Sequence, residues 1–329
     1  MLQTDTSPDL STVELSETDP AFLSDVLDGL SQAKKAIPAR WFYDRRGSEL
    51  FEEITRLPEY YPTRTETALL AEHCDEVALI AGKGRAVVEF GSGSSLKTPR
   101  LLSCVAPSAY VPIDISGDFL RDSAAALQED FPELPIVPVE ANFMHPVPLP
   151  GSVVPLPKLG FFPGSTIGNL VPRSGVDLLR DMIATMGVDS MLLIGMDRVK
   201  DTDVLIRAYD DAAGVTAAFN LNLLERINRE LGGDVPVEAF RHRALWNDTW
   251  SRIEMHLVAV RDLSFTIAGR RFTMREGETI HTENSHKYTP RSARQLLAAG
   301  GWTPLREWSD ANEMFSLILA EAKPEPAAP

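Results

Sequence analysis

The segment AVVEFGSGSSLKTPRLLSCV, residues 86–105, contains a short apolar run, a turn with two glycines and then a stretch of helical periodicity. A strand, a glycine turn and a helix in this order open many doubly wound α/β folds, although such turns are also common as structural connectors. Similar apolar runs follow at residues 110–113, 136–139, 159–162 and 191–195. Because helix-compatible segments separate these runs, the pattern predicts right-handed βαβ units and a largely parallel sheet.

This alternation stops after residue 197. Residues 203–231 predict one or two helices, and residues 252–260 and 263–274 alternate as strands do. We therefore expect an insertion that contains a small antiparallel sheet. The remaining predicted elements are helices near residues 20–30, 48–57, 65–80 and 292–299, and strands near residues 304–308 and 314–320.

The composition is that of a folded globular protein, with 329 residues of which 44% are apolar and 24% charged. Its 32 basic and 47 acidic residues give a net charge of −15, which nucleic acid and anionic membranes would repel. Neither a signal sequence nor a membrane-spanning run is evident, so we expect a cytoplasmic protein without nucleic acid or membrane partners. Two cysteines without a CxxC pair, and six histidines without metal-ligand spacing, argue against a disulfide framework and a metal site.

A carboxylate follows the glycine turn at the end of the next predicted strand. Asp114 lies 21 residues beyond Gly93, where doubly wound folds place an acid that accepts hydrogen bonds from a ribose diol. A dinucleotide site would need a third glycine after Gly91 and Gly93, and the sequence lacks it. The carboxylate of Glu89 would repel a pyrophosphate, whereas it would attract the cationic sulfonium and ammonium groups of S-adenosylmethionine (SAM). The pattern resembles motifs I and II of class I SAM-dependent methyltransferases, which we favour over an NAD-dependent oxidoreductase.

Three further residues are candidates for the same cofactor. Lys97 would face the methionine carboxylate of SAM, or else lie solvated on the following helix. Asn142 would bind the adenine edge and Phe143 would cover the ring, although Phe143 as a core residue is an equal alternative.

Candidate substrate residues lie in three other segments. The loop PGSTIGN, residues 163–169, directly follows a predicted strand, so its polar groups either bind a small ligand or cap a helix. Tyr60 and Tyr61 form a pair that more often has a packing role. Glu283 and Ser285 alternate with Asn284, so on a strand both would point to one face and could bind a ring N–H and a ring nitrogen.

Several long motifs, in order along the chain, together carry a closer resemblance. They are WFYD (41–44), LPEYYPTRTE (57–66), EFGSGSSLKT (89–98), PGSTIGN (163–169), VKDTDVLIRAYDDAAGVTAAFN (199–220), RIEM (252–255) and GETIHTENSHKY (277–288). Over about residues 22–320 the chain resembles the ergothioneine-pathway L-histidine Nα-methyltransferases. This resemblance implies transfer of three methyl groups from SAM to the α-amino nitrogen of histidine, giving hercynine in the first step of ergothioneine biosynthesis.

The resemblance also implies roles for individual residues. The cofactor would contact Glu89, Gly91, Gly93, Lys97, Asp114, Asn142 and Phe143. The substrate would contact Tyr60, Asn169, Tyr209, Met255, Glu283, Asn284 and Ser285. Tyr43, Gly164 and Thr166 would border the amine and are the candidate catalytic residues. Asn142 departs from the family pattern, which has Asp in that position.

The implied fold is a class I SAM-dependent methyltransferase, that is, a Rossmann-like doubly wound α/β sheet, with a second α+β substrate-binding domain. We expect this second domain to combine residues 18–60 with 200–285, and the SAM-binding domain to combine residues 61–199 with 286–322. Residues 1–17 and 323–329 are predicted to be loose ends. We expect a monomer. Two alternatives stay open: a family member acting on another aromatic amino acid of indole type, and a non-catalytic SAM-binding regulator.

Overall fold

The computed structural model describes residues 19–93 and 97–323, and its larger sheet has the strand order β12-β13-β6-β5-β2-β3-β4. Strands β2 to β6 pair in parallel, whereas β13 is antiparallel to both β6 and β12. The strands are β2 (Ala86–Phe90), β3 (Ala109–Asp114), β4 (Val139–Glu140), β5 (Lys158–Phe162), β6 (Met191–Asp197), β12 (Thr303–Ser309) and β13 (Phe315–Glu321). The predicted doubly wound, largely parallel sheet is confirmed.

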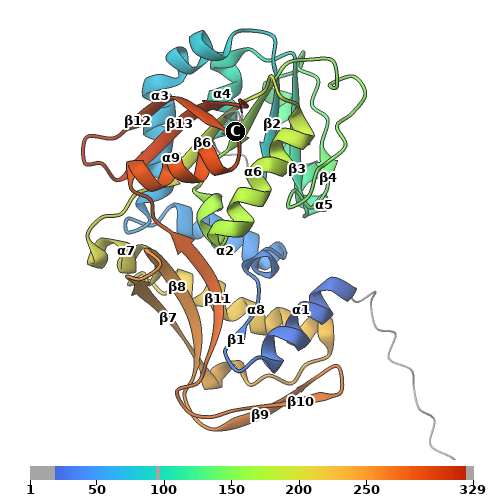
Figure 1. Ribbon diagram of the computed structural model, residues 1–329. Coiled ribbons are helices and arrows are strands. Elements are labelled where there is room, and N and C mark those ends of the chain that lie inside the picture. Colours follow the sequence, from blue (N-terminus) through green and yellow to red (C-terminus); the bar gives the residue numbers. More distant parts are fainter. Residues whose placement is uncertain (1–18, 94–96, 324–329) are drawn as a thin grey trace, which may run out of the picture.

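Helices cover both faces of this sheet (Figure 1). One apolar core joins the sheet to α3 and α4, and a second core joins its other face to α6 and α9. Successive strand residues therefore face different cores: Val87 belongs to the first and Val88 to the second. The helices are α3 (Tyr61–Ala81), α4 (Thr98–Val105), α5 (Gly117–Asp130), α6 (Pro172–Met186) and α9 (Pro290–Ala299).

A smaller sheet of order β1-β11-β8-β7 lies below the first in Figure 1. Its apolar face packs against the N-terminal helices and the inserted helices in a single core. Its strands are β1 (Lys35–Ala36), β7 (Phe240–Asn247), β8 (Arg252–Ala259) and β11 (Thr279–His286), and β9 (Leu263–Ile267) and β10 (Arg270–Met274) form a separate hairpin. The helices are α1 (Pro20–Ser31), α2 (Arg45–Thr55), α7 (Thr202–Tyr209) and α8 (Val215–Leu231).

The core of the smaller sheet is formed by buried residues from within 22–61 and 205–280. The chain crosses between the two sheets at adjacent points, where Tyr288 N donates to Asp197 O at 2.8 Å. Whether the two parts are separate folding domains stays a prediction. The expected loose ends at residues 1–17 and 323–329 lie outside the described residues except for Lys323, whose N–H donates to Glu321 O at 2.9 Å.

Several element predictions need correction. The small sheet is mixed instead of antiparallel, because β1 pairs in parallel with β11. The strand expected at residues 136–139 is reduced to Val139–Glu140, with an isolated bridge at Ile136, because Pro138 has no N–H to donate to a neighbouring strand.

The sequence argued against a disulfide framework, and one disulfide between the two cysteines corrects that expectation. Cys74 on α3 and Cys104 on α4 form a disulfide, with their Cα atoms 6.0 Å apart. These helices pack on the same face of the large sheet, and that packing brings together two residues that are 30 apart in sequence.

Candidate active site

A cavity of about 740 Å³ lies where the carboxyl ends of β2, β3 and β5 face α1, α2 and β11. Its volume falls in the usual range for small-molecule sites, and the carboxyl edge of a doubly wound sheet is where ligands of this fold class bind. Among the predicted site residues, fourteen line it: Tyr43, Tyr60, Glu89, Gly91, Gly93, Lys97, Asp114, Asn142, Phe143, Gly164, Thr166, Asn169, Glu283 and Asn284.

The glycine turn and Asp114 hold each other in place. Gly93 N donates to Asp114 Oδ2 at 3.1 Å, and Ser116 N donates to Oδ1 at 3.0 Å. Each carboxylate oxygen keeps a lone pair for a further donor, as a ribose diol would require. Gly91 has φ of +72°, and a Cβ there would lie 3.3 Å from the Phe143 ring. The turn thus needs glycine both for its backbone conformation and for its closeness to Phe143.

Glu89 lies within β2 and is 1% exposed. Its Oε2 accepts hydrogen bonds of 2.7 Å from Thr98 Oγ1 and from Tyr110 OH. Burial raises the pKa of Glu89 to about 7, although both hydrogen bonds oppose the shift. A cationic ligand group in the cavity would favour the ionised form of this carboxyl.

Lys97 is held by a residue that the sequence analysis did not single out. Its Nζ pairs with Glu66 on α3, which is fully buried and also accepts from Gly164 N at 2.8 Å. Glu66 therefore connects the start of α4 to the PGSTIGN loop. One sequence feature could have revealed it: Glu66 lies on the helix face of Pro62, Leu69 and Leu70, which is otherwise apolar.

Asn142 and Phe143 follow β4 at the cavity wall. Asn142 Oδ1 accepts from Met144 N at 3.1 Å, which leaves its amide N–H groups for other acceptors. The Phe143 ring packs edge-on against Phe90 and Phe162. Phe143 is thus part of the core and also lines the cavity, while its contact with the adenine ring stays a prediction.

The substrate candidates on β11 lie on the predicted faces. A bulge between His281 and Glu283 sets the register, after which Glu283 lies opposite Met255 and Ser285 lies opposite Ile253. Glu283 is 8% exposed, and burial raises its pKa to about 7 against the lowering effect of Lys287. Asn284 points to the other face of the strand, and its Oδ1 has no hydrogen-bond partner among the described residues.

Three predicted substrate residues do not line the cavity but lie buried in its wall: Tyr209, Met255 and Ser285. Tyr209 OH and Ser285 Oγ are 2.7 Å apart, and Lys287 Nζ donates to both at 2.9 Å. The same Nζ lies 2.7 Å from Asp197 Oδ2 at the end of β6. Lys287 and Asp197 are thus a second pair that the sequence analysis did not identify, although Lys287 lies within the GETIHTENSHKY motif.

The three tyrosines at the site stay protonated. Burial is the largest cause that raises the pKa values of Tyr43, Tyr60 and Tyr209 well above the ordinary value, and the nearby Glu283 raises each of them further. Near neutral pH these phenols act as hydrogen-bond donors and not as phenolate bases.

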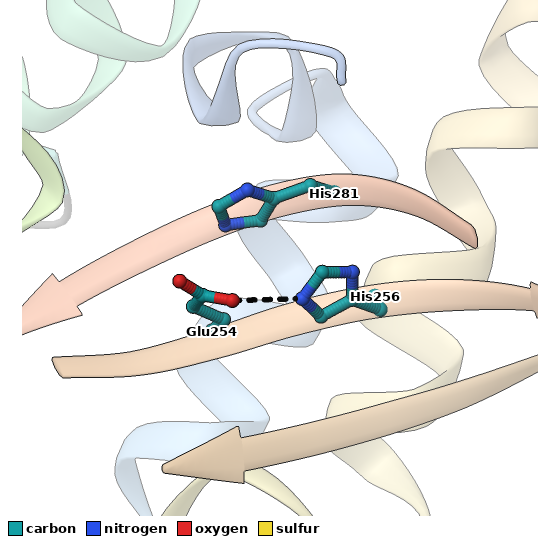
Figure 2. A group of neighbouring side chains, drawn as sticks. All are labelled: Glu254, His256 and His281. Atoms are coloured by element: carbon teal, nitrogen blue, oxygen red, sulfur yellow. Dashed lines mark hydrogen bonds and ion pairs between the residues drawn. The ribbon is translucent and has the colours of Figure 1, made fainter. Parts of the chain in front are cut away.

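A group of potential metal ligands, Glu254, His256 and His281, lies on β8 and β11 (Figure 2). The sequence spacing did not suggest it, because His256 and His281 meet only through strand pairing. Their rings stack 4.7 Å apart, and Glu254 Oε2 lies 3.2 Å from His256 Nε2. Arg252 donates to Glu254 Oε1 from Nε at 2.8 Å, so this carboxylate already has a cationic partner. The group is best described as a charge-compensated polar cluster.

Within the described part of the chain, no helix has both the length and the apolar character that crossing a bilayer requires.

The cavity itself fits the predicted cofactor. It offers a carboxylate for a ribose, an aromatic edge for adenine, and a glycine turn close to the phenyl ring that a side chain would obstruct.

The chain is similar to several known methyltransferases. The family model described as "Histidine-specific methyltransferase, SAM-dependent" matches residues 22–322. The histidine N-alpha-methyltransferases of Mycolicibacterium smegmatis and Mycobacterium tuberculosis are each 41% identical to this chain, over 91% of its length and 94% of theirs. A solved magnesium protoporphyrin IX methyltransferase from Synechocystis PCC 6803 with bound S-adenosylhomocysteine (SAH) has a TM-score of 0.45 at 10% identity, covering 86% of this chain and 97% of that one.

The family model and the two mycobacterial relatives confirm the predicted SAM cofactor and enzyme class, and the strand order already confirmed the doubly wound sheet. Because the family model spans most of the sequence, the chain belongs to the family of histidine-specific, SAM-dependent methyltransferases.

Proposed function

We propose that this protein transfers three methyl groups in succession from SAM to the α-amino nitrogen of L-histidine, forming hercynine in the first step of ergothioneine biosynthesis. One observation supports the choice of substrate above others. The buried carboxylate of Glu283 lines the cavity, and Ser285 follows on the same face of β11. A neutral imidazole has one N–H donor and one acceptor nitrogen, which an acid and a hydroxyl match, whereas an indole offers a donor only.

The proposed substrate contacts are those that the family resemblance implies, and Tyr60, Asn169 and Asn284 among them line the cavity. Asn169 and Tyr209 would bind the carboxylate of histidine, and Tyr60 would reach the imidazole through water. Met255 and Asn284 would border the ring. Tyr43, Gly164 and Thr166 would surround the amine between the two halves of the cavity.

The reaction asks the protein mainly for alignment and for exclusion of water. When bound, SAM supplies an electrophilic methyl group on its sulfonium. The lone pair of a neutral amine aligned with the S–CH₃ bond would form the N–CH₃ bond as the S–CH₃ bond breaks, and SAH would leave. The methylated ammonium would then lose a proton before each further transfer. The protonated tyrosines donate hydrogen bonds and hold the substrate without competing as nucleophiles. Repeated transfer requires the amine to rotate about its bond to Cα while the carboxylate and ring stay bound.

Mass spectrometry of histidine incubated with SAM tests this proposal. We expect products with one, two and three added methyl groups, with the trimethylated form accumulating because its nitrogen has no lone pair. Tryptophan in a parallel reaction should be methylated far more slowly. Methylation of tryptophan without methylation of histidine would contradict the proposal and favour an indole substrate. Absence of methylation on both, with retained SAH binding, would favour a regulator.

We further propose that the protein acts in the cytoplasm as a monomer, without nucleic acid or membrane partners, and that its two cores correspond to a SAM-binding and a substrate-binding domain. The net charge of −15 supports the exclusion of polyanionic partners.

A further inference from the structure

We infer that Lys287, paired with Asp197, is a positioning residue that orients the hydroxyl protons of Tyr209 and Ser285 so that this pair keeps one O–H donor for the substrate. The inference rests on the proposed function, in which Tyr209 and Ser285 hold histidine.

Lys287 and Asp197 form an ion pair without access to solvent. Both side chains are fully buried, and their charged atoms are 2.7 Å apart. Tyr61 OH donates to the same Asp197 oxygen at 2.8 Å, and Lys200 also donates to the carboxylate. Burial raises the pKa of Asp197, but Lys287 and Lys200 outweigh this and lower it. A carboxylate so held keeps the Lys287 ammonium in one position.

The three protons of that ammonium have three acceptors. Lys287 Nζ lies 2.7 Å from Asp197 Oδ2, and 2.9 Å from both Tyr209 OH and Ser285 Oγ. An ammonium donates only, so each hydroxyl oxygen must accept one hydrogen bond from it. The two hydroxyl groups therefore cannot both turn their protons toward the lysine.

The contact between the Tyr209 and Ser285 hydroxyl groups then decides which of the two keeps a proton for another acceptor. Their oxygens are 2.7 Å apart, so one O–H donates to the other. If Tyr209 donates to Ser285, Ser285 Oγ has accepted two hydrogen bonds and its own proton points outward. If Ser285 donates to Tyr209, the outward proton belongs to Tyr209. Either arrangement leaves the pair with one outward O–H donor and one unused lone pair, so a donor remains for the substrate, at the ring nitrogen or at the carboxylate.

Lys287 also acts on Glu283, which supplies the complementary acceptor. Burial raises the pKa of Glu283 to about 7, and Lys287 is the charge that lowers it. Removing Lys287 would therefore raise that pKa further and protonate Glu283 over a wider pH range. The lysine thus supports both halves of a donor–acceptor arrangement that fits a neutral imidazole.

A matched pair of variants separates this role from a purely structural one. Lys287→Met keeps the side-chain length but removes its donors. Lys200→Met removes another cation from the same Asp197, but Lys200 contacts Tyr61, Asp197 and the Arg198 carbonyl and neither of the two hydroxyl groups. Steady-state kinetics with histidine and tryptophan, and calorimetry of SAH, are compared for both variants with the parent.

We expect Lys287→Met to raise KM for histidine on the order of tenfold, to narrow the preference over tryptophan, and to leave SAH affinity within about twofold. The pH at which KM begins to rise on acidification should move upward, since Glu283 would titrate at higher pH. Lys200→Met should leave the KM values, their ratio and this pH within about twofold of the parent.

Where Lys287→Met fails to fold, the triple variant Lys287→Met/Asp197→Asn/Lys200→Met replaces it. This variant removes the Asp197 carboxylate together with both of its lysine partners, so it leaves none of the three charges unpaired yet still removes the ammonium donor, and the same kinetic changes are expected. If the parent enzyme methylates histidine but the Lys287 variant has the same kinetic constants as Lys200→Met, the positioning role is overturned. The proposed function would still stand. Parent enzyme that does not methylate histidine would overturn both.

Discussion

At the scale of single residues, the site combines carboxyl groups that serve different ends. Both carboxylate oxygens of Asp114 accept hydrogen bonds from backbone N–H groups. Glu283 instead lies buried in the cavity wall, and burial raises the pKa of its carboxyl group. Motif position predicted both residues from the sequence. Glu66 and Lys287 were not predicted, because their importance depends on partners about 30 to 100 residues away, namely Lys97, Gly164 and Asp197.

Replacement of Glu283 by Ala should raise KM for histidine by more than about tenfold, because the imidazole N–H loses a charged acceptor. The preference for histidine over tryptophan should narrow at the same time. Steady-state kinetics on both amino acids measures the two effects. Glu276→Ala, at an exposed position, is the control, and unchanged discrimination in Glu283→Ala would remove the specificity role.

Replacement of Asp114 by Ala should weaken SAH binding on the order of tenfold or more, since a ribose hydroxyl would lose a charged partner. Titration calorimetry measures the affinity directly. Asp130→Ala, an exposed residue at the end of α5, serves as the comparison. Undiminished affinity in Asp114→Ala would refute the ribose assignment.

The pKa of Glu283 also predicts a dependence of stability on pH. In the unfolded chain this carboxyl ionises near 4.5, whereas in the folded protein it stays protonated up to about 7. Its contribution to stability is therefore fully present below pH 4.5 and is lost as pH rises through 7. Relative to Glu283→Gln, the ligand-free parent should lose up to about 3 kcal/mol between about pH 5 and pH 8.

Guanidinium denaturation of both proteins at the two pH values measures this difference. Glu276→Gln provides the exposed control and should show the same pH dependence as the parent. A gap between parent and Glu283→Gln that is equal at both pH values would contradict the raised pKa.

At the scale of elements, the local sequence patterns predicted most helices and strands but placed the ends of some of them wrongly. The bounds of β2 agree with the prediction, but α2 begins at Arg45 instead of Ser48, because Asp44 caps it by accepting from Gly47 N at 2.7 Å. Strand β7 was not predicted. Its inward His242 is polar and is satisfied only by tertiary contacts, with Asn220 and the Tyr209 carbonyl, so the strand carries no clear apolar alternation.

The cap of α2 predicts a stability difference between two similar substitutions. Asp44 also accepts from Asn222 Nδ2 at 2.8 Å and pairs with Arg229, both on α8, whereas Asp19 caps α1 from an exposed position. Asp44→Ala should lower the free energy of unfolding by about 2 to 3 kcal/mol, and Asp19→Ala by about 1 kcal/mol. Chemical denaturation compares the variants, and equal losses would show that the contacts with α8 add nothing.

At the scale of the whole molecule, two sheets meet at a cavity to which both contribute. The large sheet supplies the cofactor half, and β11, which crosses back from the small sheet, supplies Glu283 (Figure 1). The large sheet and the small sheet thus each contribute polar side chains, from distant parts of the sequence, to the same cavity. The proposed transfer needs this arrangement, because the methyl donor and the amine must lie within one dry enclosure.

The proposed monomeric state can be tested in solution. Among the described residues, the large exposed apolar side chains lie on different elements and loops: Leu79, Ile115, Val154, Val171, Val188, Val199, Trp250 and Leu305. Light scattering coupled to size exclusion should give the monomer mass of 36.2 kDa, and a doubled mass independent of concentration would contradict this.

The sequence by itself determined the doubly wound sheet, the glycine turn followed by Asp114, and the strand that carries Glu283, because each depends on local periodicity or on residue order within one motif. Only the tertiary structure decided which of these groups share a cavity and what lies behind them. The Lys287–Asp197 pair, the Glu66 contacts and the Cys74–Cys104 disulfide arise where separate elements pack together. Side chains meet there through packing between elements, which no periodicity within a single segment encodes.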